Sequence, residues 1–149
     1  MNKIWKINNK EEEKFLRRKT ADFDFSKYNK KQINELVKKM KEIMIKADGV
    51  GLSANQIGLD MKVFVAQVPK IEQRGESFAV TGQKFYAVFN PKITKISEEK
   101  SPMEEGCLSV SGGISGEVER PEKITLEGRD KNGKKLKIKA WGLLARVFQ

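Results

Sequence analysis

The sequence predicts an α+β fold in which antiparallel strands pack with helices. An amphipathic helix over residues 29–48 and a hairpin signal between two alternating strands support this class. Asn29 is placed to cap the helix, and apolar residues then recur every three or four positions until Gly49. Residues 130–133 (DKNG) form the hairpin signal, because they separate two runs of alternating apolar and charged residues. A length of 149 residues is sufficient for one domain, which we expect over 1–149.

The other elements follow from composition in chain order. Residues 62–68, 84–90 and 92–97 predict strands because β-branched and aromatic residues dominate them, with Pro91 separating the last two. Residues 69–83 predict a loop, and residues 123–128 and 135–140 predict the strands of the hairpin.

Gly142 begins the final segment, GLLARVFQ, which predicts the first turns of a helix. Its expected apolar face comprises Leu143, Leu144, Val147 and Phe148. About two turns are marginal for an independent helix. We therefore expect this segment to be the start of a longer central helix, cut off at Gln149.

The composition excludes several kinds of catalytic chemistry. The sequence contains no histidine and one cysteine. A Ser-His-Asp triad, a Cys-His protease and a histidine-based zinc site are therefore excluded as self-contained mechanisms. A lone thiol and the lack of a secretory signal at the N-terminus favour the cytoplasm. No stretch approaches the roughly 18 uninterrupted apolar residues that a membrane span requires.

The charge is basic and unevenly distributed. Lys and Arg number 30 against 20 Asp and Glu, which gives a net charge of +10. The excess lies in residues 1–48 and 120–149, whereas residues 49–119 are slightly acidic. Phosphate contacts with RNA, as on a ribosome, are one interpretation. Because most of these lysines alternate with acidic residues, we favour an ordinary solvated surface.

Two segments contain residues with catalytic or binding potential. In GVGLSANQIG, Gly49 and Gly51 would let a substrate lie against the main chain, and Gln56 offers an N–H to a developing oxyanion. A purely structural turn explains this segment equally well. In MEEGCLSVSGG, Cys107 is a candidate nucleophile or metal ligand, and a small buried structural cysteine is the alternative.

Together, GVGLSANQIG, EGCLS and GLLARVFQ resemble the peptide deformylase family, metal-dependent hydrolases that remove the formyl group from N-terminal methionine. The motifs GxGLAAxQ, EGCLS and HExxH occur in that family in this order. The first two are present, with Ser53 replacing the usual first alanine, and Ser111 stands where the family has proline. The resemblance implies antiparallel sheets around a central helix, of which only the start from Gly142 is present. It also implies that HExxH would follow directly after Gln149.

The resemblance further implies roles for individual residues. Cys107 matches the metal-binding cysteine, while the Gln56 side chain and the Leu108 backbone N–H match the groups that polarise the formyl oxygen. The main-chain positions that match the peptide cleft are Val50, Gly51 and Gly106. The two histidine ligands and the general-base glutamate have no counterparts in this chain. Fe(II) is expected in the complete enzyme, with zinc, nickel or cobalt also accommodated, and no metal is expected in this chain alone.

These observations lead us to expect a cytoplasmic hydrolase that acts in protein biosynthesis and N-terminal methionine processing. Its substrates would be N-formylmethionyl nascent peptides, and a ribosomal partner is compatible with its charge. Neither a membrane nor a sequence-specific nucleic acid is expected as a partner. The 149 residues alone are expected to be inactive. The alternatives are a non-catalytic deformylase-like basic module that binds the ribosome or RNA, and a thiol-dependent enzyme that takes its base from a partner chain.

Overall fold

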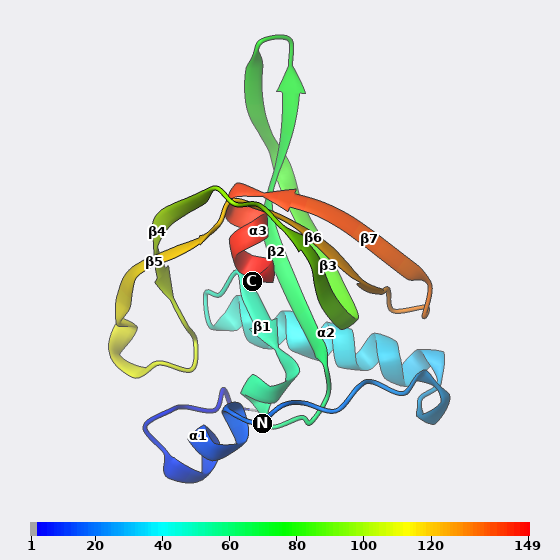
Figure 1. Ribbon diagram of the computed structural model, residues 1–149. Helices are drawn as coiled ribbons and strands as arrows, with labels where there is room; N and C mark the ends of the chain where they lie inside the picture. Colours follow the sequence, from blue (N-terminus) through cyan, green and yellow to red (C-terminus); the bar gives the residue numbers. More distant parts are fainter. Residues whose placement is uncertain (1–2) are drawn as a thin grey trace.

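A computed structural model describes residues 3–149, in which antiparallel sheets pack with α-helices and the last helix lies between the two sheets (Figure 1). The α+β class is thereby confirmed. The larger sheet has the strand order β1-β2-β3-β6-β7, and β4 pairs with β5 in the smaller one. The strands are β1 Gly51–Ser53, β2 Val63–Arg74, β3 Ser77–Ile96, β4 Lys100–Gly106, β5 Ser115–Pro121, β6 Lys123–Arg129 and β7 Lys135–Trp141. The helices are α1 Lys10–Leu16, α2 Lys30–Lys46 and α3 Gly142–Phe148, with 3-10 turns η1 Phe25–Lys27, η2 Ala54–Ile57 and η3 Ser111–Gly113.

The predicted amphipathic helix corresponds to α2. The Asn29 side chain accepts the Gln32 N–H, and the Gln32 side chain accepts the Asn29 N–H, both at 2.9 Å. This reciprocal cap satisfies donors that a helix start otherwise leaves unpaired. The face turned inward buries Ile33, Val37, Met40 and Met44. Among the described residues, no helix is both long and apolar enough to cross a membrane.

The larger sheet is covered on both faces along residues 63–66 of β2, because successive strand residues point to opposite sides. Val63 and Val65 join the core cluster that contains the buried face of α2. Ala66 joins a second cluster with residues of α3, and the Phe64 ring lies 5.5 Å from the Phe148 ring. The two helices therefore cover opposite faces of the same strand.

Residues 69–83 are not the loop that composition predicts. β2 and β3 pair from Val63↔Phe89 to Arg74↔Ser77, and the chain turns at Gly75, whose φ is +63°. Figure 1 shows this hairpin extending well beyond the rest of the molecule. Ile71 and Val80, which pair with each other on its outer part, are 63% and 67% exposed, so this part adds nothing to the core and apolar alternation is not required there. The backbone hydrogen bonds between β2 and β3 therefore continue through residues whose side chains show no strand periodicity, which is why the sequence predicts a loop here.

β3 also continues through Pro91, where the sequence predicts a break. The pairing with β6 shifts register between Phe89 and Lys92, and Asn90 has a φ of +51°. This bulge accommodates the proline, which has no N–H to donate to a neighbouring strand. The Asn90 side chain accepts the Phe23 N–H at 2.7 Å and donates to the Phe23 carbonyl at 3.0 Å. It thereby fastens the segment before α2 to the sheet.

The last helix, α3, begins at Gly142 as predicted, but its buried face differs from the expected one. Ala145, Arg146 and Phe148 are buried, whereas Leu143 is 42% exposed. The expectation that Leu143 lies on the buried face is therefore wrong. Arg146 occupies the inward position because it finds a carboxylate there. α1 and the β4–β5 ribbon were not predicted, since both are short and mostly polar at the surface.

Candidate functional site

The two sequence motifs meet where the chain leaves β4. Residues 49–58 form β1 and η2, and residues 105–109 end β4 and continue past it. The Gln56 Nε2 lies 3.8 Å from the Cys107 Sγ, although the two residues are 51 positions apart in the sequence. The fold thus brings together the amide and the thiol that the sequence singled out.

The Gln56 side chain is held in one orientation. Its Oε1 accepts the Ser53 N–H at 2.9 Å, and its Nε2 donates to the hydroxyl of Ser109 at 3.1 Å. Ser109 is only 4% exposed, and the Gln56 carbonyl accepts the Trp5 N–H at 2.7 Å. A carboxamide carries two N–H donors. With its oxygen fixed by Ser53, the group presents its nitrogen to the side where Cys107 lies.

Cys107 is exposed, so the structure contradicts the alternative of a small buried cysteine. Its carbonyl accepts the Val110 N–H at 3.0 Å, which closes a turn around Leu108. The Leu108 carbonyl accepts from Lys6 Nζ at 2.6 Å. The Leu108 side chain packs against Gly49. A Cβ at position 49 would lie 2.6 Å from the Leu108 Cδ1, so only glycine lets these two residues approach so closely. The backbone around the thiol is therefore held by contacts from three parts of the chain.

The predicted cleft positions lie on two strand ends. Gly51 pairs with Ala66 of β2, and β1 is at the edge of the larger sheet. A Cβ at Gly51 would lie 3.1 Å from the side chain of Val147 in α3. Val50 is 49% exposed, and Gly106 ends β4 opposite Ser115. An exposed edge strand can bind an extended peptide through its main chain. The role of these positions in a cleft stays a prediction.

A carboxylate next to the thiol segment is fixed by two arginines. Glu105 accepts two hydrogen bonds from Arg120 of β5, at 2.7 and 2.8 Å, and one from Arg146 of α3 at 2.8 Å. The hydrogen bonds from Arg120, and then that from Arg146, hold the pKa of Glu105 below its ordinary value, against the opposing effect of burial. The Arg146 side chain is 5% exposed and also donates to the Val118 carbonyl at 3.0 Å and to Ser101. This cluster ties α3 to the β4–β5 ribbon two residues before Cys107.

The side chains present do not by themselves fit a catalytic metal. Within residues 3–149, no group of three or more His, Cys, Asp or Glu side chains is placed to hold a metal ion. Catalytic zinc sites generally use three protein ligands and one open position. Cys107 would supply only one of the three protein ligands.

Sequence reasoning missed Ser109, Lys6 and the Glu105 cluster. Ser109 belongs to the EGCLS motif, so its contact with Gln56 could have been proposed from the resemblance. Arg146 was singled out only as part of GLLARVFQ, and its charge inside an otherwise apolar segment was a signal for a buried partner. Lys6 gives no local signal, because its contact with Leu108 joins residues 102 positions apart.

Comparison with known proteins gives one consistent result. The family model described as polypeptide deformylase matches residues 1–149. A peptide deformylase from Wolbachia sp. subsp. Brugia malayi (strain TRS) is 38% identical over 118 residues, which cover 79% of this chain and 65% of the relative. One from Roseiflexus castenholzii is 37% identical over 150 residues, which cover 98% of this chain and 79% of the relative. The alignments with three Wolbachia proteins each cover 65% of the relative's length.

Solved structures agree with this result. A probable peptide deformylase from Synechococcus phage S-SSM7 superposes with a TM-score of 0.79 at 38% identity, covering 99% of this chain and 88% of the other. Arabidopsis thaliana peptide deformylase 1B, solved with an inhibitor, gives a TM-score of 0.78 at 33% identity, covering 99% of this chain and 72% of the other. The similarity thus extends through the whole described fold.

Proposed function

The chain belongs to the polypeptide deformylase family, and from this membership we propose that its protein removes the N-terminal formyl group from formyl-methionine of newly synthesised proteins. The main support is the 3.8 Å approach of the Gln56 Nε2 to the Cys107 Sγ. It joins the family's first two motifs into one site. The reaction is hydrolysis of a formamide: a water oxygen bonds to the formyl carbon, the C–N bond breaks, formate leaves and the new amine takes a proton.

We assign the residues of this chain to binding and charge stabilisation. Negative charge develops on the formyl oxygen in the transition state, so donors aimed at that atom contribute most. The Gln56 Nε2–H and the Leu108 backbone N–H are the donors that we assign to it. Cys107 is assigned as a metal ligand. The main-chain positions assigned to the peptide cleft are Val50, Gly51 and Gly106.

The family is metal-dependent, and Fe(II) is the metal that we propose for the complete enzyme, with zinc, nickel or cobalt able to replace it. The 149 residues contain no histidine, and Cys107 does not hold a catalytic metal alone. We therefore propose that these residues are inactive unless a longer polypeptide supplies two imidazole ligands and a general base. We further propose one deformylase domain that includes residues 1–149 and acts in the cytoplasm on N-formylmethionyl nascent peptides.

The test compares two proteins: residues 1–149, and the product of the whole reading frame up to its stop codon. Formate release from a formyl-Met-Ala-Ser peptide is followed by coupled oxidation with formate dehydrogenase, and bound metal is measured by elemental analysis. We expect metal and formate release with a longer product that contains HExxH, and neither with residues 1–149. Formate release by residues 1–149 would disprove the proposed inactivity. A longer product that binds metal but releases no formate would disprove the proposed reaction.

Variants of the complete enzyme test the individual assignments. Gln56→Ala is expected to lower kcat by about 10²–10³, the usual effect of losing one oxyanion donor. Asn55→Ala is the matched control, because this neighbouring amide donates instead to the Leu16 carbonyl at 3.3 Å. Cys107→Ala is expected to abolish metal binding. Equal rates for the Gln56 and Asn55 variants would contradict the assigned role of Gln56.

A further inference from the structure

Basic side chains from three strands gather on one face of the larger sheet. Residues that pair across antiparallel strands lie on the same face, and Arg129 pairs with Lys135, while Lys139 pairs with Thr125. β3 adds a third row, because Lys95 also pairs with Thr125. We call this surface the basic sheet face; its members are Lys92, Lys95, Lys123, Arg129, Lys135, Lys137 and Lys139.

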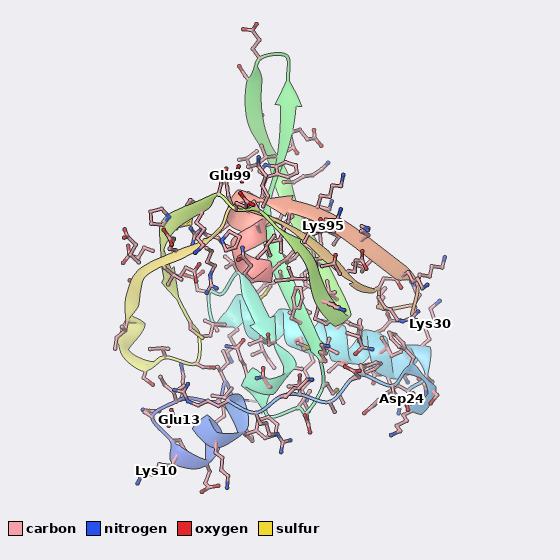
Figure 2. The ribbon with its side chains drawn as sticks, viewed as in Figure 1. Lys10, Glu13, Asp24, Lys30, Lys95 and Glu99 are labelled. Carbon is pink, nitrogen blue, oxygen red and sulfur yellow. The ribbon has the colours of Figure 1, made fainter. Side chains whose placement is uncertain are left out.

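Within the part of the chain that the structure describes, no helix covers the members of this surface, all of which are exposed. The alternate residues of β7, namely Leu136, Ile138 and Ala140, turn to the opposite face and pack in the cluster with α3. Figure 2 shows Lys95 on the larger sheet, apart from Lys30 at the N-terminal end of α2.

The positive charge of this surface is mostly unpaired. Lys137 forms an ion pair with Glu127 at 2.7 Å, and no other member of the face forms one within residues 3–149. The hydrogen bond from Lys137, together with the charges of Lys137 and Lys92, holds the pKa of Glu127 below its ordinary value. Asp130 lies at the hairpin turn, where its carboxylate accepts the N–H groups of Asn132 and Lys134. Cations therefore greatly outnumber acids here.

An exposed aromatic ring lies at one end of the same face. Trp141 ends β7, pairs with Lys123 and is 70% exposed. Alternate residues on one strand are about 6.6–6.8 Å apart, so Lys135, Lys137 and Lys139 form an evenly spaced row that leads to this ring. Evenly spaced cations next to an exposed ring match a polyanion whose bases can stack.

We propose that the basic sheet face binds single-stranded RNA through its phosphates, without sequence preference, and that Trp141 stacks on one base. A membrane surface fits less well, because interfacial binding requires a broad apolar face, whereas the members of this surface are all basic and the exposed Trp141 lies at its end. The exposed Ile93 and Ile96 of β3 pair with Leu126 and Ile124, which pack in the cluster with α3 on the opposite face. The proposal does not depend on deformylase activity. It assigns a partner to a surface distant in sequence from the motifs that contain Gln56 and Cys107.

The test measures binding of a fluorescein-labelled 12-nucleotide oligouridylate to the full-length protein by fluorescence anisotropy, between 50 and 200 mM salt. If about four phosphates are neutralised, log K against log salt has a slope of about −3. The triple variant Lys135→Glu, Lys137→Glu, Lys139→Glu should bind at least tenfold more weakly, and its slope should be shallower by about 2. Trp141→Ala should weaken binding about fivefold or more and leave the slope unchanged.

The matched control is the triple variant Lys30→Glu, Lys31→Glu, Lys39→Glu in α2, which makes the same change in net charge. We expect it to weaken binding less than threefold. Circular dichroism checks folding, and Lys→Gln at the three β7 positions replaces the Glu variant if that variant unfolds. Equal losses in both triple variants, or no RNA binding by the unchanged protein, would overturn the proposal. Binding to phosphatidylserine vesicles in preference to the oligonucleotide would overturn it as well.

Discussion

Arg146→Met tests whether the buried Arg146 joins α3 to the β4–β5 ribbon. Methionine keeps most of the unbranched stem but removes the guanidinium. The change eliminates the 2.8 Å hydrogen bond to Glu105 and the 3.0 Å bond to the Val118 carbonyl. It also removes both contacts with Ser101. Glu105 keeps its two bonds to Arg120, so the carboxylate is not left without a partner.

The structure sets the expected magnitude. The Arg146 side chain is 5% exposed, so water cannot readily replace the lost donor. Breaking a buried ion pair from one side costs about 3–5 kcal/mol. The retained Arg120 bonds place the loss at the lower end, about 3 kcal/mol. For a chain of this length, each kcal/mol shifts Tm by about 2–4 °C, so we expect a Tm lower by about 6–12 °C.

The free energy of unfolding is measured by urea titration at pH 7 with circular dichroism and tryptophan fluorescence. Arg17→Met is the matched control, because Arg17 forms an exposed ion pair with Glu13 and its side chain is 70% exposed. Such a pair within one helix contributes about 0.3–0.5 kcal/mol. A loss for Arg146→Met within about 1 kcal/mol of the control loss would refute the structural role.

The same comparison at acid pH isolates the contribution of the Glu105 charge. Arg120 and Arg146 lower the pKa of folded Glu105 from its ordinary value of 4.5. A lowered folded pKa stabilises the protein above pH 4.5, and this stabilisation disappears as the pH falls through the lower, folded value. The difference between the unchanged protein and Arg146→Met should therefore shrink below pH 4.5, while the part due to Val118 and Ser101 persists. A difference that is constant from pH 7 to pH 3 would show that the charge of Glu105 contributes nothing.

Two further stability predictions follow from close contacts and capping. Gly49→Ala should cost about 1 kcal/mol, because its Cβ would lie 2.6 Å from the Leu108 Cδ1 and displace it. Gly116→Ala, which meets nothing within 4 Å, should cost nothing, and equal urea midpoints for the two variants would contradict this reasoning. Asn29→Ala should cost about 1 kcal/mol through loss of the cap to Gln32, measured by urea unfolding, and no change in midpoint would contradict it.

Several features of the fold were predictable because they depend on near neighbours in the sequence. The cap at Asn29 and the period of the apolar residues set α2, and the turn at residues 130–133 sets the β6–β7 hairpin. In the hairpin, the Asp130 N–H donates to the Lys134 carbonyl at 2.9 Å, and Gly133 has a φ of +77°. The residue types of the candidate site were also visible in two short motifs. Their assignment depended on resemblance to a family, since neither motif was decisive alone.

Other features were decided only by the tertiary structure, because they join residues far apart in the sequence. The 3.8 Å approach of Gln56 to Cys107 and the inward turn of Arg146 toward Glu105 follow from how the sheets and helices pack. The sequence alone favoured a solvated surface for the lysines near the C-terminus, and pairing of β3, β6 and β7 places them on one face. Composition and periodicity act within a few residues along the chain, whereas pairing register and burial determine which distant side chains meet.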